Sequence, residues 1–177
     1  MQDLRDIHMK LTLLSALAGS LFVAAAAQAE TTQRDLEVIG RAVSFMQGGS
    51  GTDRTVAIVY DAASAAEAEA LHALMSGGMS AGRVTLTSRL VPASDVASVS
   101  GADAAIMLGS AASGATATTA TSQGVLTVST DLACVQSGAC VMGVQSSPAV
   151  RILLNRSAAD TASVSFETAF SMMVEEL

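Results

Sequence analysis

The sequence predicts an α/β domain: a three-layer sandwich with a mixed, mainly parallel sheet, a C-terminal hairpin and a closing C-terminal helix. Three observations lead to this prediction. Short β-branched apolar segments alternate with helical segments over much of the chain, an order typical of parallel strands joined by helices. Residues 141–144 and 149–154 are apolar segments separated by a turn at Pro148, which favours an antiparallel pair. Residues 165–177 carry apolar side chains at helical spacing.

The first predicted elements follow the order helix, strand, helix, strand. Residues 31–46 have an apolar stripe at helical spacing and end before a glycine pair. Residues 55–60 are short and β-branched, as in a buried strand, and residues 62–75 form an alanine-rich helix that stops at two glycines. Residues 83–87 alternate apolar and polar side chains, which indicates a second strand.

The middle of the chain continues the alternation less clearly. Residues 92–100 suggest a short helical turn with Ser94 as a candidate N-cap, and residues 104–108 a third buried strand. Residues 109–124 contain many threonines and glycines and no large side chain, so we expect a frayed helix or a loop there. Residues 125–128 form a fourth strand. The final helix would begin at Ser165 as its cap.

The N-terminus has the three parts of a secretory signal peptide. Arg5 and Lys10 supply positive charge, residues 11–27 are apolar or small, and Ala27-Gln28-Ala29 fits a cleavage site. An uncleaved membrane anchor is the alternative, but the apolar run is short for a span of about 20 residues. We therefore expect residues 1–29 to be a signal peptide cleaved after Ala29, and residues 30–177 to be one domain located in the periplasm.

Charge and motifs exclude several function classes. The net charge is −7, which disfavours nucleic acid and anionic lipid as partners and leaves proteins and small molecules. The glycine-rich stretches lack a Walker lysine and the spacing of a dinucleotide loop, so no cofactor is predicted. A secreted hydrolase is disfavoured because no GxSxG elbow accompanies His72, and the chain is predicted not to be an enzyme.

Cys134 and Cys140 are the only cysteines of the chain. They could form a disulfide, half of a metal site or a redox couple. An oxidising compartment favours the disulfide. A zinc site needs further ligands, and His72 is the only histidine after the predicted leader, so no metal is predicted. A redox couple of the CxxC type has two intervening residues, whereas this pair has five.

Two charged residues are candidate ligand or partner contacts. Asp61 follows the strand at residues 55–60, and ligands of open α/β sheets bind beyond the carboxyl ends of the strands. A turn or cap role for Asp61 is the alternative. Arg151 alternates out of the apolar face of its strand, where it would be solvated or would contact an anion or a partner protein.

Residues 124–144, GVLTVSTDLACVQSGACVMGV, and residues 150–170, VRILLNRSAADTASVSFETAF, resemble the YfiR/HmsC family of exported proteins. The shared order is a leucine-threonine-valine-serine strand, a cysteine segment, a strand of arginine and apolar residues ending in asparagine, an alanine-rich link and a C-terminal helix. The chain departs from the family in its few aromatics near the start, in having a single cysteine pair, and in Arg156 after the asparagine.

The resemblance implies a periplasmic, non-enzymatic regulator. Such proteins bind the periplasmic sensory domain of an inner-membrane diguanylate cyclase, hold it inactive and so limit cyclic-di-GMP signalling and biofilm formation. The alternative is a periplasmic small-molecule binding module related to the solute receptors of ABC transporters, because residues 54–74 suit one lobe of such a receptor. A homodimer and a small ligand are left open as further partners.

Overall fold

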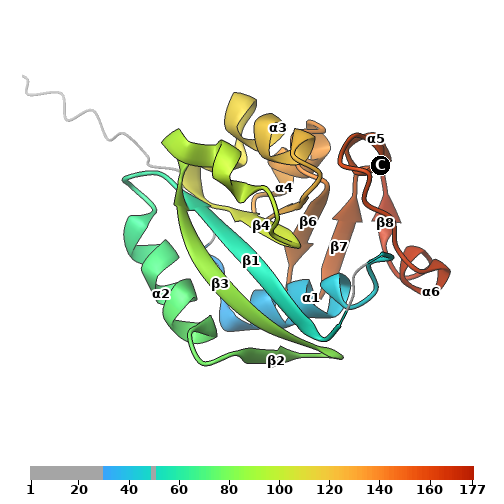
Figure 1. The fold of residues 1–177 in the computed structure, drawn as a ribbon. Helices are drawn as coiled ribbons and strands as arrows, with labels where there is room; N and C mark the ends of the chain where they lie inside the picture. Colours follow the sequence, from blue (N-terminus) through green and yellow to red (C-terminus); the bar gives the residue numbers. More distant parts are fainter. Residues whose placement is uncertain (1–29, 49–50) are drawn as a thin grey trace, which may run out of the picture.

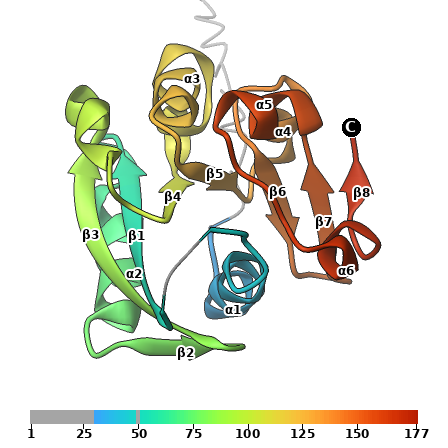
Figure 2. The same cartoon turned by 45° about the vertical axis from the view of Figure 1, so that its right-hand side comes forward.

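The computed structural model describes residues 30–48 and 51–177, so the predicted signal peptide lies outside the described residues. Figures 1 and 2 show one twisted sheet with helices on both of its faces. Its eight strands have the order β2-β3-β1-β4-β5-β6-β7-β8. Within the described ranges, none of the helices combines the length and the apolar character needed to cross a membrane.

The strands are β1 (Asp53–Tyr60), β2 (Met79–Ala81), β3 (Val84–Pro92), β4 (Ala104–Met107), β5 (Leu126–Ser129), β6 (Met142–Gln145), β7 (Arg151–Leu154) and β8 (Glu175–Glu176). The helices are α1 (Gln33–Val43), α2 (Ala65–Met75), α3 (Gly114–Ser122), α4 (Leu132–Gln136), α5 (Arg156–Thr161) and α6 (Thr168–Ser171). Two 3₁₀ segments, η1 (Ala93–Val99) and η2 (Gly109–Ala112), complete the described elements.

The pairing of the strands confirms the predicted fold class. Strands β3, β1, β4, β5 and β6 run parallel, β2 is antiparallel to β3, and β7 is antiparallel to β6. The predicted C-terminal hairpin is β6–β7, with Met142 opposite Leu154 and Gln145 opposite Arg151. The sheet is therefore mixed and mainly parallel, as the alternation of strands and helices predicts.

Each face of the sheet has its own core, which gives the three layers. The α1 and α2 face is built from large aliphatic side chains; its fully buried members include Leu36, Ile39, Ile58, Leu71, Leu86, Ile106, Leu126 and Met142. The α3 and η1 face is built from smaller ones; its members include Ala57, Val59, Ala105, Met107, Ala117, Ala120, Cys134 and Cys140. In Figure 2, α1 and α3 lie on opposite sides of the sheet.

The expectation of a loop or frayed helix at residues 109–124 is wrong over its second part, because α3 forms there. Tertiary packing explains this, since Ala117, Ala120 and Thr121 are buried. The hydroxyl groups also have partners. Thr118 donates to the carbonyl of Gly114 at 3.1 Å, and Ser122 donates to the carbonyl of Thr118 at 2.9 Å. Small side chains thus allow close packing despite a weak intrinsic preference for helix.

The predicted helix over residues 165–177 is wrong over most of its length. Only α6 is helical, Glu167 and not Ser165 is its N-cap, and the chain then forms β8 at the edge of the sheet. The expected N-cap at Ser94 is also wrong, because the N-cap position of η1 is occupied by Pro92 and Ser94 lies inside η1. The helical spacing of the aromatic residues has another cause: Phe166 and Phe170 stack with their ring centroids 4.7 Å apart, and Phe45 lies 5.6 Å from Phe170.

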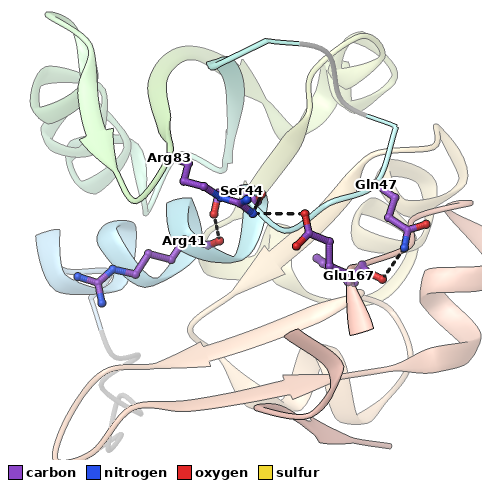
Figure 3. Close-up of polar contacts among 6 residues, drawn as sticks. Arg41, Ser44, Gln47, Arg83 and Glu167 are labelled. Carbon is purple, nitrogen blue, oxygen red and sulfur yellow. Dashed lines mark hydrogen bonds and ion pairs between the residues drawn. The ribbon is translucent and has the colours of Figure 1, made fainter. Parts of the chain in front are cut away.

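Polar contacts fasten this C-terminal segment to the end of α1 (Figure 3). The backbone N–H of Gln47 donates to Ser165 at 2.9 Å, and the N–H of Glu167 donates to the carbonyl of Phe45 at 2.9 Å. Arg83 donates to the carbonyl of Ser44 at 2.9 Å and pairs with Glu167 at 3.3 Å. These bonds divert the chain from a continuous helix and bring its last residues beside β7.

Candidate functional site

A cleft opens beyond the carboxyl ends of β4, β5 and β6, where ligands of open α/β sheets bind. Its largest part is a cavity of about 380 Å³ between the N-terminus of α1 and the ends of β5 and β6. The residues around it are Glu30, Thr32, Arg34, Asp35, Thr130, Val144, Gln145, Ser146 and Ser147. We refer to this cavity and its two smaller neighbours, described below, as the carboxyl-edge cleft.

Asp35 fixes one wall of the carboxyl-edge cleft. Its side chain is buried and accepts hydrogen bonds from the N–H of Thr32 at 2.8 Å, the hydroxyl of Thr32 at 2.6 Å and the N–H of Ser146 at 3.1 Å. Thr32 in turn accepts from the N–H of Asp35, which completes a capping box. Burial raises the pKa of Asp35, but the bonds from Thr32 and Ser146 outweigh it and leave the pKa below its ordinary value.

Thr31 lines a second cavity, of about 280 Å³, which lies on α2 and shares Glu30 with the larger cavity. The N–H of Thr31 donates to Glu67 at 2.7 Å, and its hydroxyl lies 3.3 Å from the hydroxyl of Thr130. The second cavity is lined by Glu30, Thr31, Ala66, Glu67, Ala70, Leu71 and Leu74. A third cavity, of about 20 Å³, shares Glu67 with the second one and lies between Glu67, Gly109 and Asp131.

The chemistry of the carboxyl-edge cleft suits binding. Its walls are mainly apolar. Its polar groups are hydroxyls, backbone groups, the amide of Gln145, the guanidinium of Arg34 and the carboxylates of Glu30, Asp35, Glu67 and Asp131. Such an arrangement, a mainly apolar cavity with a few fixed polar groups, is typical of small-molecule sites. Among residues 30–48 and 51–177, no group of three or more histidine, cysteine or acidic side chains is placed to hold a metal ion.

Asp61 follows the last residue of β1. In the sheet β1 lies between β3 and β4, so the chain forms β3 on one side of β1 and β4 on the other. Its carboxylate accepts from the N–H and hydroxyl of Ser64, at 2.9 and 2.8 Å. It also accepts from the N–H of Ser110 at 2.9 Å and from the hydroxyl of Ser110. These bonds, those of Ser110 first, hold the pKa of Asp61 far below its ordinary value. These contacts agree with the alternative in which Asp61 stabilises the turn after β1. A ligand role for Asp61 stays a prediction.

Asp61→Asn should lower the free energy of unfolding by about 2 kcal/mol at pH 7, because the amide places N–H groups against serine donors. A depressed folded-state pKa stabilises the protein above the unfolded pKa, about 3.9, and that contribution is lost as the pH falls. The difference from the wild type should therefore shrink below about pH 4. Urea unfolding at several pH values measures it, with the exposed Asp95→Asn as control. A difference that is equal at pH 3 and pH 7 would contradict the assignment.

A disulfide joins Cys134 to Cys140, as predicted, with the two Cα atoms 5.2 Å apart. Cys134 belongs to α4, and the N–H groups of Ala139 and Cys140 both donate to its carbonyl at 3.1 Å. Gly138 makes the turn with a φ of 77°, which favours glycine. The bond therefore ties the end of a short helix to the start of β6.

Replacing both cysteines by alanine should lower the free energy of unfolding by about 2 kcal/mol and leave the fold intact, since the closed loop is short. Urea unfolding with and without a reductant measures this. Reductant should destabilise the wild type to a similar extent and leave the double variant unchanged. A double variant as stable as the oxidised wild type would show that the bond does not constrain the chain.

Arg151 is exposed on β7 and bonds within the chain. Its Nε and Nη2 donate to both carboxylate oxygens of Glu175, at 2.9–3.1 Å. Its contact with an anion or a partner stays a prediction. Its strand partner Gln145 lines the larger cavity, so Arg151 lies near the outer end of the carboxyl-edge cleft. His72 contacts Ser88, with Nδ1 2.8 Å from the hydroxyl oxygen.

The residues that shape the carboxyl-edge cleft were missed at the sequence level. Asp35, Glu67, Thr130 and Ser146 come from four separate segments, and only their contacts in the folded chain bring them together. One signal was present: Thr32 and Asp35 have the spacing of a capping box at the start of a helix.

No protein-family model matches this chain, and no curated protein matches it. Among solved structures, it is similar to a conserved domain protein from Vibrio cholerae O1 biovar El Tor, with a TM-score of 0.56 and 11% sequence identity. The similarity covers 84% of this chain and 61% of that chain. This chain thus spans about three fifths of the length of that protein, and at this identity the likeness shows the fold alone.

Proposed function

We propose that this chain is a non-enzymatic regulator of the periplasm. It binds the periplasmic sensory domain of an inner-membrane diguanylate cyclase, holds the enzyme inactive and limits cyclic-di-GMP signalling and biofilm formation. The resemblance of residues 124–170 to the YfiR/HmsC family supports the class of partner. A disulfide and the lack of a membrane-spanning helix in the described part of the chain are compatible with an exported protein.

The observation that carries a binding role is the open outer face of α2. Ala66, Ala70, Ala73 and Leu74 are exposed there beside a single charged residue, Glu69, and Leu74 has 46% of its surface exposed. A helix in a soluble domain normally presents polar residues to water. This apolar face adjoins the carboxyl-edge cleft through the cavity on α2, so a protein that covers α2 would also contact the cleft.

Capture from solubilised inner membranes tests the proposal. The immobilised protein should retain a membrane protein that carries a GGDEF domain. Leu74→Lys should abolish this capture because it places a charge in the apolar face. Met172→Lys is the matched control, since Met172 is also exposed but lies in the C-terminal segment. Failure to capture any cyclase, or capture that Leu74→Lys leaves unchanged, would contradict the proposal.

The size and position of the larger cavity favour a second candidate, a small-molecule binding module. At about 380 Å³, this cavity is large enough for a small metabolite and lies where α/β sheets bind ligands. Thermal unfolding with a set of small polar metabolites should then reveal a stabilising ligand. Gln145→Trp, at the exposed wall of this cavity, should remove the effect. A ligand without any membrane partner would favour this module over the regulator.

A further inference from the structure

The sheet has a long unpaired edge along β3. On its outer side β2 pairs only with Val84, Thr85 and Leu86, the first three residues of β3. On its inner side β1 pairs with β3 from Thr85 to Pro92 without a break in register. No strand of the described chain therefore pairs with residues 87–92 on the side away from β1. In Figure 2, this part of β3 continues past β2 at the outside of the sheet.

The pairing shows which backbone groups of β3 face outward. The N–H of Thr85 donates to the carbonyl of Thr52 at 2.8 Å, so Thr85 directs its backbone groups towards β1. Successive residues of a strand direct these groups alternately to the two sides. Ser88 and Leu90 therefore present N–H and C=O groups outward, and Pro92 presents its carbonyl. None of the turn, loop and cap bonds between backbone groups of the described chain involves Ser88 or Leu90.

The side chains along this edge give it little protection. Natural sheets usually guard an edge strand with projecting charges or a covering segment. Arg89 is the only charged residue among residues 87–92, and its guanidinium donates to the carbonyl of Ser100 at 3.3 Å, at the end of η1. Leu90 is partly exposed and packs against the core on the α1 and α2 face. The edge is thus available for pairing with a further strand.

We propose that β3 pairs in antiparallel orientation with β3 of a second copy of this chain, about a two-fold axis through Leu90. In this register Leu90 faces Leu90 of the other copy, and the two exchange a pair of N–H to C=O hydrogen bonds. The N–H of Ser88 in each copy donates to the carbonyl of Pro92 in the other, which adds two more. The outward groups of one edge thus match those of the other, as a two-fold contact requires.

Charge and the position of β2 disfavour the neighbouring registers. An axis through Arg89 would pair Ser88 with Leu90 but would place two guanidinium groups directly opposite each other, which is destabilising. An axis through Ser88 would pair Leu90 with Leu86, whose outer side is already occupied by β2. About the axis through Leu90, Arg89 faces Val91 instead. The two Leu90 side chains then lie side by side and cover the parts that are exposed in one copy.

The contact is small, because it consists of four backbone hydrogen bonds and a few side chains. Stable interfaces usually bury about 1,200–2,000 Å². The dimer should therefore dissociate on dilution. Sedimentation velocity of the purified wild-type protein over a wide range of concentrations should show a monomer–dimer equilibrium.

A cysteine at position 90 locates the axis. Leu90→Cys places the two new thiols on directly opposite residues, whose Cα atoms lie about 5.5 Å apart in such a pair, within the range of a disulfide. Mild oxidation should therefore cross-link most of the dimer. Thr87→Cys is the matched control: Thr87 is more exposed on the same strand, but its two copies would lie about 20 Å apart and should not cross-link. The native cysteines stay in the buried bond between Cys134 and Cys140.

A charge at the same position tests the contact without a cross-link. Leu90→Glu should weaken the dimer by about tenfold relative to Leu90→Gln, because two carboxylates would face each other across the axis. The two variants have side chains of similar size and the same backbone groups, so they differ only in charge. Thermal unfolding of each variant shows whether its fold is retained.

Three results would each overturn the proposal. One is a wild-type protein that is monomeric up to its solubility limit, as would be seen if the edge takes a strand from a different protein. Another is a Leu90→Cys protein that cross-links no faster than Thr87→Cys. The third is a Leu90→Glu dimer as tight as that of Leu90→Gln. Either of the last two would place the contact elsewhere.

Discussion

Replacing Gly40 by alanine should lower the free energy of unfolding by about 2–3 kcal/mol. Gly40 lies in the middle of α1, and a Cβ atom there would lie 2.2 Å from the Cβ of Ala81 and 3.0 Å from Cδ1 of Leu86. The Cβ of Ala81 is fixed to the backbone of β2 and cannot rotate away. Alanine favours helix over glycine by about 1 kcal/mol, but this gain is smaller than the cost of separating α1 from the sheet.

Gly77→Ala is the matched control, because no atom lies within 4 Å of a Cβ at that position. It should leave the free energy of unfolding unchanged or raise it. The Gly40 variant should also disturb the carboxyl-edge cleft, since α1 carries Thr32 and Asp35 at its start. Urea unfolding measures both variants. A Gly40→Ala protein as stable as the wild type would contradict the close packing of α1 on β2.

Replacing Asp103 by alanine should cost about 3 kcal/mol of the free energy of unfolding. Asp103 pairs with Nη1 of Arg54 at 3.1 Å and accepts from the N–H of Thr55 at 2.8 Å. Arg54 is 7% exposed, and its Nε is buried without a hydrogen-bond partner in the described structure. Without Asp103, the buried guanidinium would lose the carboxylate that compensates its charge.

The double variant Arg54→Met/Asp103→Ala separates this effect from a simple loss of contacts. Methionine has a similar volume and no charge, so the double variant should recover most of the stability lost in Asp103→Ala. A double-mutant cycle from urea unfolding gives the coupling between the two residues. If the double variant is as unstable as Asp103→Ala alone, the buried charge does not explain the cost.

The strands were the most predictable part of the fold. β4, β5 and residues 56–59 of β1 are short and buried on both faces, and such segments are recognisable because their residues are nearly all aliphatic or small. β2 and β8 were missed, because they have only three and two residues and form by pairing with neighbours distant in sequence. No local pattern of that length specifies a strand.

The two wrong expectations for helices have opposite causes. α3 has a poor sequence for a helix and forms because its alanines fill a narrow space beside η1 and β5. The C-terminal segment has a good helical pattern and does not follow it, because Phe166 and Phe170 pack on Phe45 and Leu177 bonds to β7. In both places tertiary contacts outweigh local preference.

The candidate site was predictable only in its position. The rule that ligands bind beyond the carboxyl ends of parallel strands points to the edge at which the carboxyl-edge cleft lies. Asp61 was chosen because it follows a strand, yet both of its oxygens are bound to Ser64 and Ser110. The cleft depends instead on Asp35 and Ser146, which are 111 residues apart. Such a pairing is not visible in one sequence.

The cellular level of cyclic-di-GMP tests the proposed function most directly. Deletion of the gene should raise it, because the cyclase is released from inhibition. Restoring the full chain should lower it again, whereas a chain without residues 1–29 should not, since it would stay on the wrong side of the membrane. An unchanged level on deletion, in cells shown to produce the protein, would contradict the account.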